Sequence, residues 1–428
     1  MKIAVAQAVQ IIAPYMLAVS GPLVLSATQF VLSVVLVHLM SPKDFGTFSF
    51  LMVTSQFLMS FSGAFLCAPL PVVMARAGKT GDAATVDCLF GVNIIIGLLA
   101  FIVLTALSAA LGIEILPAAL FGGFASLTML RWFGRAYVYA IGLPQRATLS
   151  DIVSGVVLGV GIGLIAWQGN ASPLFAYGFL MLSAAGGLLA FGPRHLAEQL
   201  RLPRLEELSR YGAVWKEHSS WSLLGLVTTE ATGNAHAYFV TLISGAVAFA
   251  ALAASALLIR PAIILMNALG EFERPRLARL VAQQRWSDVD RTLSLFRFIL
   301  MSGWFATLGL GVIVAYFAPS LLFSKDYDLL YVQKAFALWL AIMGLRLVRT
   351  PESILLQAAG QFRVLAFSSV YSSVISIILV VVMVWVVGPL YSMVGVLAGE
   401  AIFTLAVWRV ARAWRWKGRQ ASPHVQLP

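Results

Sequence analysis

Long hydrophobic stretches separated by short polar segments dominate the chain. A membrane-spanning helix needs about 20 apolar residues, and about 12 segments meet that requirement. This pattern predicts an all-α polytopic membrane protein. The predicted helices cover residues 17–39, 46–70, 86–110, 115–140, 149–168, 173–192, 219–243, 247–269, 294–318, 330–350, 364–387 and 389–411.

Composition and charge support a lipid environment and give an orientation. Of 428 residues, 60% are hydrophobic and only 11% are charged, whereas a soluble domain carries roughly 25% charged residues. The net charge is +11, and arginine is concentrated in alternate loops, while the opposite loops hold only Lys43, Lys325 and Lys334. The positive-inside rule predicts that the Arg-rich side, with both termini, is cytoplasmic. On that side, segments 193–218 and 271–293 are predicted to be amphipathic interfacial helices.

The second six predicted helices repeat features of the first six. Arg131 and Arg135 correspond to Arg346 and Arg349, and the turn "GLPQR" corresponds to "AGQFR". The spacing between matched residues changes only slowly along the chain. We therefore expect two six-helix lobes related by a pseudo-twofold axis along the membrane normal. The predicted lobes are residues 1–205 and 206–411, followed by a basic cytoplasmic tail at 412–428.

Five of the arginines within predicted helices are candidate functional residues, because an ionisable group there is energetically costly. Arg131 and Arg346 lie roughly 24 Å from the external ends of their helices, and Arg260 has a similar depth. Two equivalent arginines are expected to face each other across an inward-open cavity, where their forked donors suit a pyrophosphate. Arg135 and Arg349 lie nearer the interface and would gather an anionic headgroup. The alternative is that each arginine only reaches toward the interface and sets topology.

Two acids lie near the predicted bilayer centre. Glu230 belongs to a polar helical stripe with Asn234 and His236, and such a stripe is expected to face a cavity. It would contact sugars or exchange a proton, or it would form interhelical hydrogen bonds or a salt bridge. Glu400 is a second candidate for such a cavity or coupling site. However, it has no polar neighbours along its own helix, which favours a structural role.

Several other classes of function lack support in the sequence. It contains no paired carboxylates, P-loop or Cys/His cluster, so we expect no catalytic residues, no metal site and no enzymatic activity. The internal duplication suits a channel or a structural scaffold less well than a transporter, and a channel would need a repeated pore-lining filter. Trp408, Trp414 and Trp416 alternate with basic residues near the C-terminus. This arrangement favours anchoring at the membrane interface over nucleic-acid binding.

Several short motifs recur at the ends of the predicted helices: "LMSPKDFGTFSF" after the first helix, Pro71 followed by Arg76 after the second, and the turns "GLPQR" and "AGQFR". These motifs resemble those of Wzx-type oligosaccharide flippases, the polysaccharide transport branch of the multidrug/oligosaccharidyl-lipid/polysaccharide (MOP) exporter superfamily. The resemblance covers essentially the whole chain. It implies the two-lobed MOP fold and a cationic cavity that carries over onto Arg131, Arg260 and Arg346.

The resemblance also implies a function. It implies flipping of undecaprenyl-pyrophosphate-linked oligosaccharide repeat units by alternating access, for O-antigen, capsule or exopolysaccharide synthesis. The location implied is the bacterial inner membrane, with a polysaccharide polymerase and chain-length machinery as partners, no cofactor, and H⁺ or Na⁺ as the coupling ion. The alternatives are an ion-coupled multidrug exporter and a lipid II-type flippase. The first helix has no carboxylate, which counts against a cation exporter.

Overall fold

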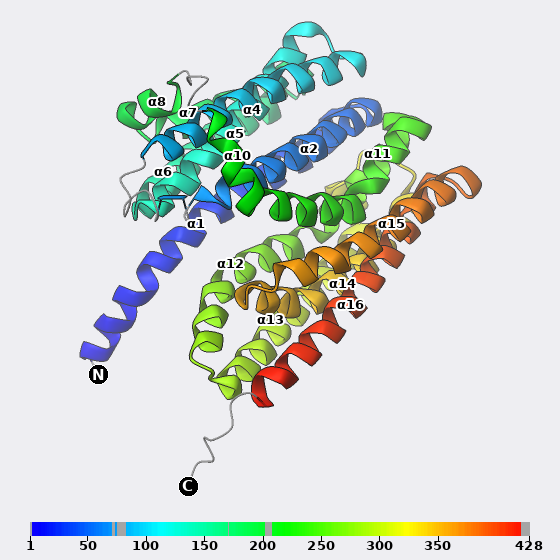
Figure 1. Ribbon diagram of the computed structural model, residues 1–428. Helices are drawn as coiled ribbons and strands as arrows, with labels where there is room; N and C mark the ends of the chain where they lie inside the picture. Colours follow the sequence, from blue (N-terminus) through cyan, green and yellow to red (C-terminus); the bar gives the residue numbers. More distant parts are fainter. Residues whose placement is uncertain (1, 71–72, 75–82, 170, 202–207, 421–428) are drawn as a thin grey trace. The chain divides into compact units, whose positions relative to one another are not determined.

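The computed structural model describes residues 2–70, 73–74, 83–169, 171–201 and 208–420, and most of these residues are helical (Figure 1). The N-terminal helices are α1 (Lys2–Leu39), α2 (Pro42–Ser62), α4 (Ala83–Ala110), α5 (Ile115–Ala140), α6 (Pro144–Gln168), α7 (Pro173–Leu189), α8 (Pro193–Gln199) and α10 (Tyr211–Val214). The later helices are α11 (Ser220–Ala256), α12 (Arg260–Ala282), α13 (Trp286–Val312), α14 (Leu329–Ala358), α15 (Phe362–Val386) and α16 (Ser392–Gln420).

The chain divides into two compact units, residues 1–226 and 227–428. The sequence places the boundary between lobes at 205/206, whereas the structure places the division inside α11. Side-chain contacts explain the difference, because the residues just before α11 are attached to the first unit. The Tyr211 hydroxyl donates to the carbonyl oxygen of Phe65 at 2.8 Å, and the Ser219 hydroxyl donates to the same oxygen at 2.9 Å.

The internal packing of the two units supports the predicted repeat. In the first unit α5 packs on α4 and α7, and α7 also packs on α6. The second unit has the equivalent pairs, in which α14 packs on α13 and α16, and α16 also packs on α15 (Figure 1).

The turns that follow α5 and α14 are also equivalent. Gly142 and Gly360 have φ angles of 76° and 72°, a left-handed conformation that glycine adopts readily. Beside them the backbone N–H of Leu143 donates to Val138, and that of Gln361 donates to Leu356, both at 2.8 Å. The two turns therefore close in the same way.

The helices are long and apolar enough to cross a membrane many times. Within the described part of the chain, ten helices qualify as spans by length and composition, or 11 when α7 and α8, which meet at an angle of 106°, are taken as one bent span. One of these runs, 61 residues from Ser222 to Ala282, contains Gly245 at φ 85°, which separates it into two helical arms. The expectation of about 12 spans fits this count.

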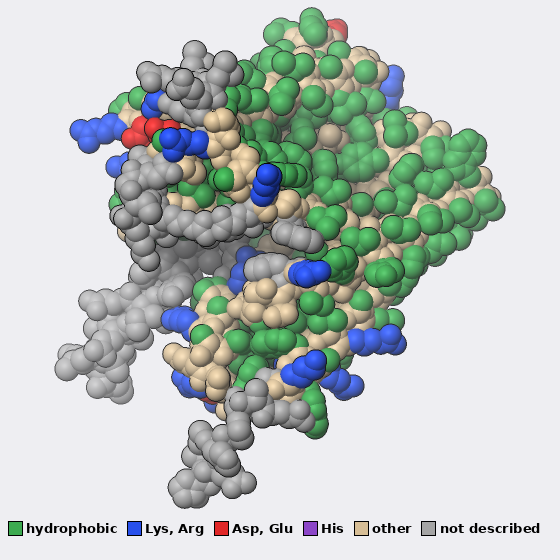
Figure 2. Space-filling view, in the orientation of Figure 1, with side chains coloured by type: hydrophobic (Ala, Val, Ile, Leu, Met, Phe, Trp, Pro, Cys, Tyr) green, Lys and Arg blue, Asp and Glu red, His purple; other side chains and the backbone are tan. Residues whose placement is uncertain are grey.

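Exposed apolar side chains identify the surfaces that face lipid. On α15, Tyr371, Ile378 and Trp385 lie on one face and are 72%, 56% and 72% exposed. Figure 2 shows hydrophobic side chains covering this part of the second unit. A surface of this kind is stable only against a hydrocarbon solvent or another protein. It agrees with a multi-pass membrane protein.

Several helices extend further toward the Arg-rich side than the sequence predicts. The prediction for α5, residues 115–140, is confirmed, but α6 begins at Pro144 and α14 continues to Ala358. The prediction of a separate interfacial helix at 271–293 is wrong. Those residues continue α12 and begin α13, and the two helices meet in a tight turn at Gln284, whose φ is 56°.

Candidate functional site

The first unit contains a buried cluster of two arginines and one acid, here called the N-cluster. Arg131 Nη1 donates to Asp151 Oδ1 at 2.8 Å, and Arg135 Nη2 lies 3.2 Å from Asp151 Oδ2. The side chains of the two arginines are only 3% and 9% exposed. Arginine stays protonated in proteins, so two positive charges face one carboxylate, and the N-cluster has a formal charge of +1.

Helical spacing and small residues build the N-cluster. Arg131 and Arg135 are one turn apart on α5 and therefore share a face, while Asp151 comes from α6. Gly187 on α7 and Gly21 on α1 allow close approach. A Cβ on Gly187 would lie 2.7 Å from Arg131 Cδ, and one on Gly21 would lie 2.6 Å from Asp151 Oδ2. Four helices thus enclose the three charged groups.

The second unit contains the equivalent arginines in a cluster here called the C-cluster. Arg346 Nε donates to Glu400 Oε1 at 2.7 Å, and Arg349 Nη1 donates to the other carboxylate oxygen. The Arg349 guanidinium also lies over the ring of Phe403 at 4.1 Å. The formal charge is again +1. Here, however, the arginine side chains are 20% and 12% exposed, so they are less enclosed than those of the N-cluster.

The acid in the C-cluster comes from a helix that is not equivalent to its counterpart. Asp151 lies on α6, whereas Glu400 lies on α16, the equivalent of α7. These ion pairs agree with the structural role expected for Glu400, and the arginines that pair with it belong to α14 and not to its own helix. Arg346 also approaches α11, since a Cβ on Gly233 would lie 2.8 Å from Arg346 Nη2.

The predicted polar stripe of α11 separates into three environments. Asn234 Nδ2 donates to Glu230 Oε2 at 2.6 Å, so these two residues pair with each other. Thr228 and Thr232 instead hydrogen-bond to serines of α15. His236 is 3% exposed, and its ring lies 5.3 Å from that of Trp339. Glu230 and Asn234 therefore remain together as a candidate site, while His236 is packed among aromatic side chains.

Arg260, the remaining predicted site residue, begins α12 beside Pro261. Its side chain is half-buried. Among the residues that the structure describes, no carboxylate lies within ion-pair distance of it. Arg260 therefore differs from the four arginines of the N- and C-clusters, whose charges are partly neutralised.

Two buried acids that pair with arginines of other helices are absent from the sequence-based candidates. Asp151 is one, and Glu352 on α14 is the other. Glu352 pairs with Arg297 of α13, and lies 3.6 Å from Arg415 of α16, so it ties three helices together. Both acids fall outside or at the edge of the predicted spans, which end too early on the Arg-rich side. Longer helices in the prediction would have placed both acids inside the bundle.

The described residues contain no candidate metal-binding site. No three His, Cys, Asp or Glu side chains there come close enough together to hold an ion. The site chemistry of the two units is therefore that of guanidinium groups, carboxylates and amides.

The fold matches solved structures of transporters. The chain is similar to an inward-facing multidrug resistance MATE family transporter of the MOP superfamily, with a TM-score of 0.67, 14% identity and coverage of 95% of this chain and 99% of that one. It is also similar to a MATE in complex with MaL6 (TM-score 0.64, 13% identity, 96% of each chain). A third similar structure is a eukaryotic MATE transporter (TM-score 0.61, 14% identity, 96% and 97%).

These similarities establish the fold class. The chain has the MATE-like helical fold over essentially its whole length, and its structural neighbours are transporters of the MOP superfamily. No protein-family model matches the sequence, and no curated protein matches it by sequence.

Proposed function

We propose that the protein is an alternating-access flippase that carries a polyprenyl-pyrophosphate-linked oligosaccharide between the leaflets of a bacterial inner membrane. The MATE-like fold supports the class of membrane transporter. The net positive charge of the two arginine clusters supports an anionic substrate. The motifs shared with Wzx-type flippases support an oligosaccharide repeat unit for O-antigen, capsule or exopolysaccharide synthesis.

The observation that carries the proposal is the charge of the C-cluster. Arg346 and Arg349 together face a single carboxylate, so one positive charge is left over. The Arg346 side chain is 20% exposed, against 3% for the equivalent Arg131, and this exposure supports access for a ligand. Guanidinium groups bind phosphate oxygens in a bidentate manner, and an uncompensated charge in a partly desolvated site attracts a diphosphate strongly.

The N-cluster has a different role in this proposal. Its guanidinium groups are enclosed by four helices, so they hold α5 against α6 and α7 and do not contact the substrate. Arg260, which has no carboxylate partner among the described residues, assists in holding the pyrophosphate. Glu230 and Asn234 contact the glycan, and Glu230 is the proposed site for a coupling H⁺, with Na⁺ as the alternative ion.

The proposed function includes an orientation in the membrane and partners in the cell. Both termini lie in the cytoplasm, as the distribution of arginine over the loops indicates. The oligosaccharide is received from enzymes on that side and delivered to a polymerase and its chain-length machinery on the other. No nucleic acid takes part.

The main alternative is a multidrug exporter, the function named for one structural neighbour. The absence of any carboxylate from α1, Lys2–Leu39, argues against export of cations. A lipid II-type flippase is the second alternative and would use the same C-cluster for its pyrophosphate. Only the glycan would differ.

Transport by purified protein in proteoliposomes tests the proposal. We expect a fluorescent polyprenyl-pyrophosphate oligosaccharide to cross the bilayer and ethidium to stay outside. A lipid II analogue in a parallel reaction measures selectivity for the glycan. Transport of ethidium without transport of either glycolipid would replace the flippase by the drug exporter.

A further inference from the structure

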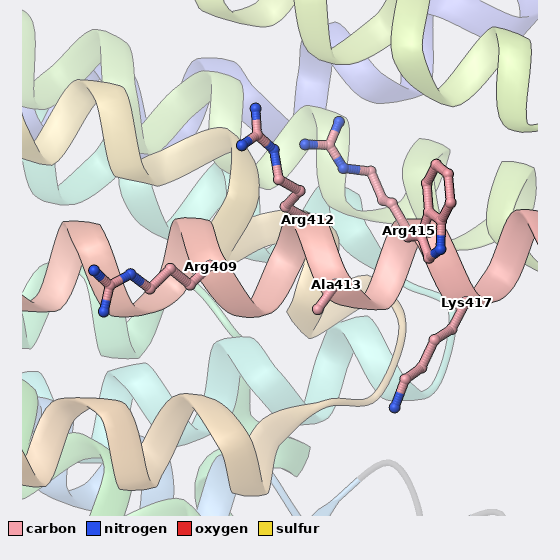
Figure 3. A pocket seen from close by; sticks show the side chains of 6 residues that line it. Arg409, Arg412, Ala413, Arg415 and Lys417 are labelled. Carbon is pink, nitrogen blue, oxygen red and sulfur yellow. The ribbon is translucent and has the colours of Figure 1, made fainter.

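A basic pocket lies at the C-terminal end of α16. Its volume is about 740 Å³, and among the described residues it is lined by Arg409, Arg412, Ala413, Arg415, Trp416 and Lys417 (Figure 3). All six belong to the last three turns of one helix. Neither of the arginine clusters contributes to this pocket.

The charge of the pocket is largely uncompensated. Arg415 lies 3.5 Å from Asp290 and 3.6 Å from Glu352, so its charge is neutralised. Arg409, Arg412 and Lys417 are exposed, and no described carboxylate lies within 4.0 Å of them. The pocket therefore presents three positive charges that have no protein partner in the described part of the chain.

The helix that forms the pocket is firmly held. Arg415 joins α16 to α13 through Asp290 and to α14 through Glu352. The ring of Trp414 meets that of Trp286 edge-on, with centroids 5.5 Å apart. Because the helix is fixed on this face, the basic side chains opposite are presented without the entropic cost of ordering a free tail.

The location of the pocket favours a membrane lipid as its ligand. The span that contains α16 runs from Pro389 to Lys417, so the pocket lies where that span ends. Trp416 is 64% exposed, and an exposed tryptophan at the end of a span is typical of the headgroup region of a bilayer.

We infer that this pocket binds the phosphodiester headgroup of an anionic phospholipid from the adjacent leaflet. Arg409, Arg412 and Lys417 leave the helix in different directions (Figure 3) and together supply the positive potential that holds the phosphodiester, while Trp416 lies beside the glycerol backbone. Basic pockets at the ends of transmembrane helices recognise such headgroups by charge complementarity. The inference does not depend on which substrate the protein transports.

Lipid titration followed by native mass spectrometry tests the inference. Full-length protein in neutral micelles receives phosphatidylglycerol or phosphatidylcholine. We expect wild type to bind phosphatidylglycerol preferentially. Since each basic residue near an anionic surface contributes about fivefold, the triple variant Arg409→Gln, Arg412→Gln, Lys417→Gln should lose about 100-fold in apparent affinity.

A matched variant controls for the loss of charge. Arg274→Gln, Arg279→Gln, Arg291→Gln removes the same number of exposed cations from α12 and α13 and should bind phosphatidylglycerol as wild type does. Equal binding by wild type and the pocket variant would overturn the inference, as would an equal loss in the matched variant. Displacement of the lipid by millimolar inorganic phosphate would also overturn it, because the pocket would then bind soluble phosphate.

Discussion

The N- and C-clusters place the same arginines on equivalent helices but surround them differently. In the first unit the Arg131 side chain is 3% exposed, whereas the equivalent Arg346 in the second unit is 20% exposed. The acid also comes from a different helix, Asp151 from α6 and Glu400 from α16. A duplicated bundle has thus kept two arginines and one acid in each half, although the acid occupies non-equivalent positions.

This difference in exposure distinguishes the N-cluster, whose charges have a structural role, from the C-cluster, whose charges we propose to bind substrate. A fully buried pair of ions contributes little net stability, but a buried charge that loses its partner destabilises a protein strongly. The N-cluster therefore makes its unit intolerant of change at Asp151. In the C-cluster, exposure lowers this penalty and leaves the guanidinium groups within reach of a ligand.

The largest expected effect is the loss of stability from Asp151→Ala. Without the carboxylate, Arg131 and Arg135 are two buried like charges, and we expect the free energy of unfolding to fall by about 3–5 kcal/mol. Thermal unfolding in detergent measures this loss. Glu400→Ala should cost less, because its arginines are partly solvated.

A double variant gives the control for the Asp151 prediction. Asp151→Ala with Arg131→Leu returns the net charge of the N-cluster to +1 and should recover much of the lost stability. If Asp151→Ala and Glu400→Ala were equally damaging, the distinction between a structural and a functional cluster would fail.

The next effect is on transport and arises from Arg346→Ala. Removal of one charge-assisted hydrogen bond to the substrate costs about 1.5–3 kcal/mol, so the rate of glycolipid transport at low substrate should fall about 10- to 100-fold. The thermal midpoint should change little. Arg346→Lys keeps the charge but loses the forked donor and should be intermediate. Unchanged transport by Arg346→Ala would remove this residue from the site.

The smallest expected effects come from two glycine-to-alanine substitutions, which test how easily each cluster accommodates an added methyl group. A Cβ at Gly187 would meet both Arg131 Cδ at 2.7 Å and the carbonyl oxygen of Ser150 at 3.0 Å. We expect Gly187→Ala to destabilise by about 1–3 kcal/mol, because backbone must move.

The matched change in the second unit is Gly233→Ala. Its Cβ would meet only the guanidinium group of Arg346, with Nη2 at 2.8 Å, and a long side chain can move aside. Thermal unfolding should show a shift for Gly187→Ala and almost none for Gly233→Ala, while Gly233→Ala lowers transport modestly. A larger loss of stability from Gly233→Ala would show that the C-cluster is as rigid as the N-cluster.

Hydropathy and charge were sufficient to predict the class of fold, the approximate number of spans and the equivalence of Arg131 with Arg346. They were insufficient for ion pairs, because a pair between helices depends on rotation and tilt, which apolar periodicity does not determine. A 20-residue window begins this helix at residue 149 and so places Asp151 at its edge, whereas the helix begins at Pro144 in the structure and Asp151 lies two turns inside it. Glu400 is recognisable from the sequence as an acid within a predicted span, but its arginine partners lie on a different helix, α14.

The most direct test of the proposed role of the C-cluster is equilibrium binding of a short-chain polyprenyl-pyrophosphate disaccharide to purified protein. Wild type should bind it, and the double variant Arg346→Gln, Arg349→Gln should bind it at least about 100-fold more weakly. The same lipid with a neutral linkage in place of the pyrophosphate should bind both proteins equally. Full affinity of the double variant for the pyrophosphate lipid would contradict the assignment of the C-cluster as the substrate site.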